Sequence, residues 1–198
     1  TGMQVQEGTL KPTDPLCVAL GGIALVPEDA LNISAGFTTS FIDNLNLSVD
    51  YYSVEIDNKI IKSRSLAVEG SAEFSELAFY TNALNTKTSG IDIVATYTLS
   101  GGTNIGLAVN TNTTEVVSQN LVNGLNPVSD GTVFNLENNL PQLRLSATVN
   151  HSFSDALSLM VRMNHYGETI DERGGQEKVD PAQLIDVELN YRISDNLS

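Results

Sequence analysis

Residues 143–163 read LRLSATVNHSFSDALSLMVRM, and this stretch decides the fold. In residues 143–149, an apolar residue stands at every second position and Arg, Ser or Thr stands between. Turn-forming residue types follow at 154–156, and the alternation returns in residues 157–163. A period of two is that of a β-strand, whose successive side chains point to opposite faces. The stretch therefore predicts a β-hairpin with one apolar face and one polar face.

The same pattern recurs along most of the chain. It covers residues 31–41, 45–51, 91–99, 105–109 and 185–193. Turn-forming residues stand at Asp43-Asn44 and Gly101-Gly102, and again at Asp195 after the last stretch. We expect an all-β chain, an antiparallel up-and-down meander of about seven strands, or about eight if residues 18–26 also pair. Past Tyr52 the alternation changes phase, which predicts a bulge there or the exit from a buried layer.

Short and long connections alternate between these strands. The long ones cover roughly residues 63–86, 118–140 and 168–182. Outer-membrane barrels have this arrangement, with tight turns on the periplasmic side and long loops outside the cell. We therefore expect residues 27–198 to form hairpins of a transmembrane β-barrel, and residues 1–26 to be a loop or a partial strand.

The residue types at the polar positions favour a barrel over a soluble sheet. Solvent-facing strands of soluble sheets commonly carry Lys and Glu, whereas here these positions hold mostly Asn, Ser, Thr and Gly. Small neutral groups suit the crowded aqueous lumen of a barrel. Aromatic residues also lie near the predicted strand ends, as in interfacial girdles. They are Phe41 and Phe153 beside turns, and Tyr51, Tyr52 and Tyr166 toward the outer ends.

Two other architectures fit the alternation when it is taken alone. A soluble β-sandwich that serves as a binding module alternates in the same way, because each of its sheets has one buried face. A complete small outer-membrane barrel of about eight strands, with an adhesive or structural role, is also within reach of 198 residues.

Composition narrows the function. The 198 residues include 10 basic and 24 acidic ones, so the formal net charge is −14, and only 17% of residues are charged. Without any basic stretch, the chain is not expected to bind nucleic acid. The single Cys17 cannot form an internal disulfide. No apolar run reaches the roughly 18 residues that a membrane-spanning helix needs.

Charged residues at polar positions of the strands are the candidate ligand contacts. They are Arg144, Arg162, Arg192, Asp186 and Glu188. One interpretation is an internal network of ion pairs and hydrogen bonds that satisfies these charges. The other is a surface that guides an anionic ligand, because ionisable groups within a membrane span are commonly functional.

No enzymatic signature accompanies these residues. His151 and His165 fall at apolar positions, and the G-x-S-x-G element of serine hydrolases is absent. The acidic residues within 168–180 lack the D-x-D-x-D-G order of a calcium loop. We therefore expect no catalysis, no metal site and no cofactor.

Segments in a fixed order carry a resemblance to a known family. Residues 27–62, PEDALNISAGFTTSFIDNLNLSVDYYSVEIDNKIIK, hold an Asn-x-Ser-x-Gly strand, a tight turn, and a strand ending in Asp-Tyr-Tyr before Ile-Asp-Asn-x-Ile. Residues 79–99, FYTNALNTKTSGIDIVATYTL, then Leu140-Pro141, then residues 161–168, VRMNHYGE, follow. Together they resemble the C-terminal part of the β-barrel of TonB-dependent outer-membrane receptors.

The resemblance implies uptake of a scarce nutrient across the outer membrane of a Gram-negative bacterium. The cargo is typically a ferric siderophore, with haem, cobalamin or saccharide carried by other members. Outer-membrane lipid and the TonB complex are the implied partners, the latter engaged through an N-terminal part. Because the family's plug domain and TonB box are not among these residues, we expect the chain to be a fragment of a longer receptor.

Overall fold

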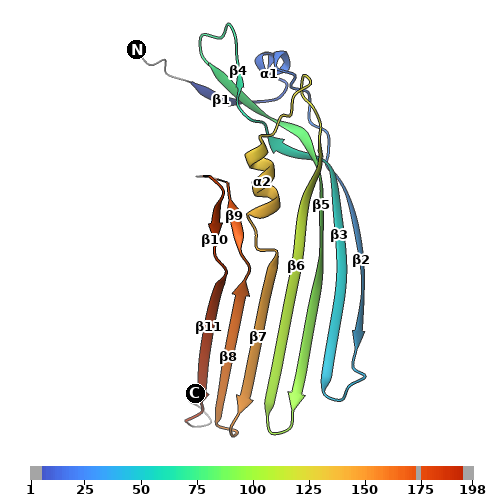
Figure 1. Cartoon of the computed structure of the whole chain (residues 1–198), viewed down its shortest axis with the longest axis vertical. Helices are drawn as coiled ribbons and strands as arrows, with labels where there is room; N and C mark the ends of the chain where they lie inside the picture. The colour runs from blue at the N-terminus through green and yellow to red at the C-terminus, as the bar shows by residue number, and fades with distance from the viewer. Residues whose placement is uncertain (1–5, 173–174, 194–198) are drawn as a thin grey trace. The chain divides into compact units, whose positions relative to one another are not determined.

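The computed structural model describes residues 6–172 and 175–193, and most of them lie in β-strands (Figure 1). The main path of the sheet runs in the order β2-β3-β5-β6-β7-β8-β11. Its strands are β2 (Asp29–Thr39), β3 (Leu45–Lys62), β5 (Glu76–Leu99), β6 (Thr103–Gln119), β7 (Leu143–Ser152), β8 (Leu157–Tyr166) and β11 (Ala182–Tyr191). Neighbours on this path are consecutive along the chain except for short inserted elements, which confirms the predicted meander.

The inserted elements are short. They are β1 (Glu7–Leu10), α1 (Pro15–Ala19), β4 (Leu66–Ala67), α2 (Asp130–Asn138), β9 (Thr169–Asp171) and β10 (Glu177–Val179). β1 and β4 pair with β5, and β9 pairs with β10 in a separate small sheet. Neither described helix is long and apolar enough to cross a membrane.

The chain divides into two compact units. The sheet unit comprises Ile33–Ser53, Ser89–Thr113 and Asn138–Ser198. The loop unit comprises Thr1–Asn32, Val54–Thr88 and Thr114–Glu137. Because β3, β5 and β6 each contribute residues to both, the boundary cuts through long strands rather than through linkers.

In the sheet unit, the strand register sorts side chains onto two faces. Figure 1 shows β7, β8 and β11 side by side, and their pairing is antiparallel. Every printed pair between β6 and β7, β7 and β8, and β8 and β11 joins an odd-numbered residue to an odd-numbered one, or even to even. The row Ile105, Val149, Val161, Val187 thus crosses one face. The row Gly106, Thr148, Arg162, Asp186 crosses the other.

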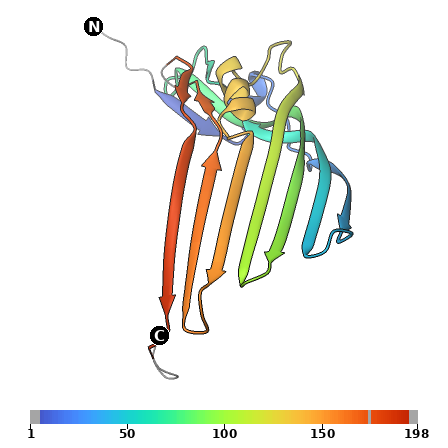
Figure 2. The same cartoon turned by 60° about the horizontal axis from the view of Figure 1, so that its bottom comes forward.

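Tight turns close the hairpins where the sequence predicts them (Figure 2). Gly101 and Gly102 link β5 to β6 with φ of 88° and 81°, a backbone region that glycine occupies without steric cost. Between β2 and β3, Asn44 has φ of 64°. Between β7 and β8, the Phe153 amide donates to the Leu157 carbonyl at 2.9 Å. The turn predicted at Asp195 lies outside the described residues.

The phase change past Tyr52 coincides with the passage of β3 out of the sheet unit, which ends at Ser53. β3 continues unbroken as far as Lys62, and Val54 and Ile56 are partly buried in the loop unit. The strand is uninterrupted at this position and passes into the loop unit, which has the buried core, rather than out of a buried layer. The alternation changes because the strand's surroundings change.

Gly90 allows the Tyr52 ring to lie against β5 in the sheet unit. A Cβ at Gly90 would stand 2.5 Å from the Tyr52 hydroxyl oxygen and would also collide with the Thr111 carbonyl oxygen. At Gly106, by contrast, the nearest atom to an added Cβ is the Thr148 Cβ at 4.0 Å. Two strand glycines of the same unit therefore differ in their tolerance of a side chain.

We predict that Gly90→Ala destabilises the protein by about 1–3 kcal/mol, because the added methyl forces Tyr52 or the β6 backbone to move. Gly106→Ala, which meets only van der Waals contact, is the matched control and should change stability little. Urea unfolding of the full receptor in lipid vesicles measures both variants. Equal stability losses in the two would contradict the packing seen at Gly90.

The loop unit has a buried core of its own. Leu77, Ala78 and Phe79 are fully buried, as are Ala83 and Leu84 further along β5. The first residues of β5 have a strand on each side, because β1 pairs with them in parallel and β4 pairs antiparallel. The β1–β5 pair is a parallel exception to the antiparallel meander.

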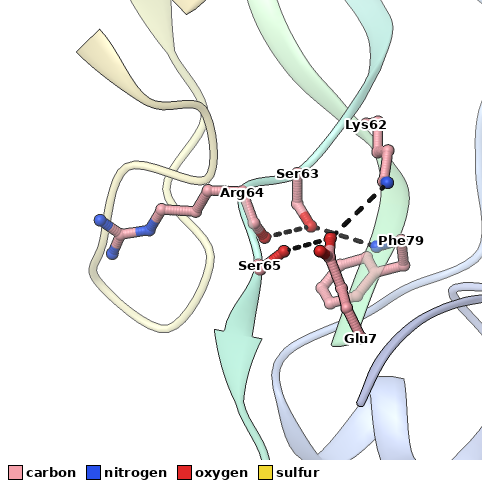
Figure 3. Close-up of polar contacts among 6 residues, drawn as sticks. All are labelled: Glu7, Lys62, Ser63, Arg64, Ser65 and Phe79. Atoms are coloured by element: carbon pink, nitrogen blue, oxygen red, sulfur yellow. Dashed lines mark hydrogen bonds and ion pairs between the residues drawn. The ribbon is translucent and has the colours of Figure 1, made fainter. Parts of the chain in front are cut away.

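Side-chain hydrogen bonds fix β1 and the end of β3 around β5 (Figure 3). The buried Ser63 hydroxyl accepts from the Phe79 amide at 3.1 Å and donates to the Arg64 carbonyl at 2.9 Å. The Glu7 carboxylate accepts from the Ser65 hydroxyl at 2.5 Å and lies 3.9 Å from the Lys62 ammonium. These contacts supply polar partners at the place where β3 passes into β4.

The expected long connections contain more regular structure than the sequence predicts. The loop expected at residues 63–86 ends at Glu76, where β5 begins. Alternation fails there because residues on both faces of the strand are buried, which removes the polar half of the pattern. The connection at 118–140 contains α2, whose Val133 and Leu136 pack on Ala83, Leu84 and Val128. The connection at 168–182 contains β9 and β10.

Residues 18–26 do not form the additional strand. Val18 lies in α1, and the chain from Gly22 to Glu28 has no regular structure. One side chain, that of Asn82, takes the place of a strand partner: its Oδ1 accepts from the Val26 amide at 2.9 Å and its Nδ2 donates to the Val26 carbonyl at 2.9 Å. The Asn82 side chain, rather than a neighbouring strand, thus supplies the hydrogen bonds to the Val26 backbone.

Cys17 is fully buried in α1. Burial, reinforced by the nearby Asp14 carboxylate, raises the pKa of its thiol above the ordinary value of 9.0. A raised folded-state pKa favours the protonated thiol, so its contribution to stability is present below the unfolded-state pKa and is lost as the pH rises through the folded-state value.

We therefore predict that Cys17 reacts slowly with 5,5′-dithiobis(2-nitrobenzoate) at pH 8 in the folded protein, because the reactive thiolate is both disfavoured and enclosed. In denaturant the same thiol should react at the rate of a small-molecule thiol. Absorbance of the released thiol reports both rates, with a Cys17→Ser variant as the blank. Rapid labelling without denaturant would contradict the burial.

Candidate functional site

The apolar face of the sheet unit is exposed. Val187 on β11 is 66% exposed and Val149 on β7 is 41% exposed, although both stand at apolar positions of well-paired strands. Also exposed are Ile33, Phe37, Tyr97, Ile105, Phe153, Val161, Met163, Ile185, Leu189 and Tyr191. A soluble protein rarely leaves so continuous an apolar surface in contact with water. The surface is suited to contact with lipid hydrocarbon.

Exposed aromatic side chains gather near the tight turns. Phe41 is 98% exposed beside the β2–β3 turn, and Phe153 follows the end of β7. Tyr191 pairs with Leu157 at the turn end of β8. This distribution is that of an interfacial girdle. Tyr166 does not belong to it, because it pairs with Arg144 on the opposite face.

Both histidines stand at apolar positions of the ladder, as predicted. His151 pairs with Leu159, and His165 pairs with Leu145. The Nδ1 atom of His151 lies 2.7 Å from the Thr103 hydroxyl oxygen, and its ring meets that of Phe153 edge-on with centroids 4.4 Å apart. These contacts are structural ones on the exposed face.

The polar face carries cross-strand hydrogen bonds between neutral groups and single charges. Asn110 Nδ2 on β6 donates to Asp92 Oδ1 on β5 at 2.6 Å. Nearer the turn, the Thr98 hydroxyl donates to Asn104 Oδ1 at 2.9 Å. Such side chains remain hydrated in an aqueous lumen and would be costly to bury in lipid.

The five charged candidates are spread along this face rather than collected in one site. Arg162 stands directly opposite Asp186 near the middle of β8 and β11. Its Nε donates to the Thr148 hydroxyl at 3.2 Å, and Asp186 accepts from Asn164 Nδ2 at 3.3 Å. Glu188 accepts from Asn190 Nδ2 at 2.6 Å.

Arg144 and Arg192 lie at opposite ends of the strands. Arg144 is the second residue of β7, at the end away from the β7–β8 turn. Arg192 follows the last residue of β11, and its amide donates to the Ala156 carbonyl of that turn at 2.8 Å. Arg144 and Arg192, which the sequence grouped as candidate ligand contacts, therefore cannot belong to one compact site.

A hollow of about 460 Å³ adjoins Arg144, and we call it the Arg144 hollow. Its polar lining includes Asp92, Asn110, Arg144, Ser146, Asn164 and Tyr166. In the ladder, Asn110 pairs with Arg144, and Arg144 pairs with Tyr166. Asp92 and Tyr166 were not among the residues predicted as contacts. The alternation places Asp92 on the polar face, but only the register reveals its neighbours.

Metal binding finds no support in the side chains. Within residues 6–172 and 175–193, no cluster of three or more His, Cys, Asp or Glu is arranged to hold a metal ion. The described acidic residues of the connection at 168–182 include Glu168, which binds Lys178 on β10 at 2.6 Å. This hydrogen bond, strengthened by the carboxylate charge, raises the pKa of Lys178 above its ordinary value.

One exposed apolar face and one hydrated polar face on a single meander define a wall between lipid and an aqueous lumen, which is the wall of a transmembrane β-barrel. The family of the chain follows from comparison with known proteins. Residues 7–198 match the family described as TonB dependent receptor-like, beta-barrel, and the chain belongs to that family. Its members are transport receptors of the Gram-negative outer membrane and not enzymes.

Solved structures of such receptors share the fold. The FrpB iron transporter from Neisseria meningitidis superimposes with a TM-score of 0.63 at 15% identity, over 87% of this chain and 26% of the transporter. A mutant of the ferric enterobactin receptor PfeA from Pseudomonas aeruginosa gives 0.61 at 18% identity, over 86% and 24%. The copper transporter OprC gives 0.60 at 12% identity, over 87% and 24%.

The chain therefore spans about a quarter of the length of the receptors that it matches. No curated protein matches it. The likeness to a barrel wall contradicts the soluble β-sandwich that the alternation also allowed. The exposed apolar face is consistent with this outcome, because a sandwich would cover that face with a second sheet.

We predict that Val161→Arg, at the middle of β8 on the apolar face, destabilises the receptor in lipid vesicles by about 2–4 kcal/mol, because the charge enters hydrocarbon. Met160→Arg is the matched control. Met160 is the neighbour of Val161 in β8, and its side chain points to the polar face, as do those of its ladder partners Asn150 and Glu188. Denaturant titration in vesicles compares them. A greater loss for Met160→Arg would reverse the assignment of the two faces.

Proposed function

We propose that this chain is part of the barrel of an outer-membrane receptor that takes up a scarce nutrient, such as a ferric siderophore, with energy delivered through TonB. The observation that carries the proposal is the exposed apolar face backed by a polar face on one meander, in a chain that belongs to the receptor family. The polar face lines the lumen, and the apolar face contacts outer-membrane lipid.

The nature of the cargo is supported by the related receptors. Two of them are an iron transporter and a ferric enterobactin receptor, and a third is a copper transporter. A ferric complex is thus the first candidate, and a copper species is the second. Haem, cobalamin and saccharide, which the sequence resemblance also suggested, have no counterpart among these three structures.

The tight turns face the periplasm and the long connections face the outside of the cell. Supporting this orientation, β3, β5 and β6 have 18, 24 and 17 residues, more than the roughly 9–11 that a membrane-spanning strand needs. The surplus residues pack in the loop unit around a buried core, as chain outside a membrane does. Ligand recognition then involves residues of the polar face.

Exposed loop surfaces of such a receptor are also open to foreign proteins. The receptor FpvAI in complex with pyocin S2 matches this chain with a TM-score of 0.55 at 17% identity, over 86% of this chain and 22% of that one. A protein such as a pyocin is therefore a second class of partner, secondary to the nutrient.

The proposal is tested by measuring accumulation of ⁵⁵Fe-siderophores in iron-limited cells that carry or lack the full receptor. We expect accumulation of one ferric siderophore to fall to background when the receptor is deleted, and to return when it is supplied on a plasmid. Deletion of tonB should abolish the same uptake, because the barrel has no energy source of its own. A parallel assay with ⁶⁴Cu distinguishes a copper receptor.

Accumulation that persists without TonB would overturn the energised mechanism. Unchanged accumulation of every tested iron and copper species in receptor-deleted cells would overturn the nutrient assignment.

A further inference from the structure

Within the described residues, two arginines of the polar face have no side-chain partner: Arg144, which lines the Arg144 hollow, and Arg192 at the turn end. Arg162 donates to Thr148 and stands opposite Asp186. Within the described residues, no hydrogen bond or ion pair engages the Arg144 guanidinium. Arg144 is nevertheless part of the lining of a hollow of about 460 Å³. Its donors are therefore available to a group that enters the hollow.

Asp92, the acidic residue nearest to Arg144 in the ladder row, already accepts a hydrogen bond from Asn110. Asp92 lies on β5, with Asn110 of β6 between it and Arg144 on β7. Asn110 Nδ2 donates to Asp92 Oδ1 at 2.6 Å, and Asn110 Oδ1 accepts from Asn112 Nδ2 at 3.1 Å. Asn110 is thus bonded to Asp92 and Asn112, and within the described residues no hydrogen bond joins its side chain to Arg144.

Two hydroxyl groups complete the donor set. Tyr166 pairs directly with Arg144 across the β7–β8 ladder. Ser146 lies two residues after Arg144 on β7, so its side chain is on the same face. Both line the hollow. The guanidinium offers a planar fork of donors that matches the two oxygens of a carboxylate. The single positive charge of Arg144 with neutral hydroxyl donors balances one carboxylate group, whereas the nearby Asp92 charge opposes a group that carries two charges on one centre, such as phosphate.

We propose that Arg144, Tyr166 and Ser146 form a binding site for one carboxylate group on the lumen face of the barrel. Arg144 holds the two carboxylate oxygens, and the hydroxyls donate to whichever oxygen lone pairs remain. The inference rests on the proposed function, in which this face lines the lumen. The carboxylate comes either from a free ligand or from another part of the receptor, and both sources satisfy the same donors.

The test uses the purified full receptor in detergent micelles, with sodium succinate as the probe and sodium chloride at equal ionic strength as the reference. The variants are Arg144→Gln, Arg144→Lys and Tyr166→Phe. Arg64→Gln is the matched control, because Arg64 is an exposed arginine of the loop unit whose side chain points away from the other residues labelled in Figure 3. Calorimetric titration measures succinate binding, and circular dichroism measures the melting temperature.

If the carboxylate belongs to a free ligand, succinate binds the wild type and Arg64→Gln equally. Arg144→Gln should then weaken binding by about tenfold or more, the usual effect of losing hydrogen bonds to a charged group, and Tyr166→Phe should weaken it less. Arg144→Lys should be intermediate, since it keeps the charge without the fork.

If the carboxylate belongs to the receptor, the site is filled and the wild type does not bind succinate. Arg144→Gln and Tyr166→Phe should then melt at lower temperature than Arg64→Gln, with Arg144→Lys between. The proposal is overturned if Arg144→Gln and Arg64→Gln agree in both succinate affinity and melting temperature.

These readouts are independent of the uptake assay. A receptor that carries no iron or copper but shows the Arg144 effects refutes the nutrient assignment alone. A receptor that transports a ferric siderophore through TonB without any Arg144 effect refutes the carboxylate site alone.

Discussion

The register of the antiparallel ladder is the constraint on which the rest of the structure depends. Each printed pairing among β6, β7, β8 and β11 joins residues of the same parity, so the two faces stay distinct from strand to strand. A slip of one residue would carry Arg162 to the lipid face and Val161 to the lumen. The cost of a charge in hydrocarbon opposes such a slip, and the hydrogen bonds of Thr148 and Asn164 favour the observed register.

β3, β5 and β6 contribute residues to both units, and the surroundings of their side chains differ between the two. In the sheet unit, side chains alternate because lipid lies on one side and water on the other. In the loop unit, β5 is enclosed by β1 and β4, and Leu77, Ala78 and Phe79 are buried in succession. Asparagine and serine side chains then complete the backbone hydrogen bonding, as Asn82 does for Val26 and Ser63 does for Phe79. The connections are thus a packed structure rather than open loops.

Most charged groups of the polar face are hydrogen-bonded to a neighbour, whereas within the described residues the Arg144 and Arg192 guanidinium groups are not. Among the bonded groups, Asp92 accepts from Asn110 and Glu188 accepts from Asn190. This supports the interpretation of an internal network for that part of the face. Arg144 lines its hollow together with the hydroxyl-bearing Tyr166 and Ser146, which is why a ligand role is assigned to it and not to the whole set of five.

The sequence by itself determined most strands, their faces and the tight turns, because period-two alternation and turn residues are local properties, and its ordered motifs carried the resemblance to the receptor family. It missed the start of β5 at Glu76 and the helix α2, where burial on both faces or tertiary packing replaces alternation. It found Arg144 but not the proximity of Tyr166 and Asn110, which are distant in sequence. Only the tertiary structure decided these neighbours, because the pairing register, and not the chain order, sets which side chains meet across strands.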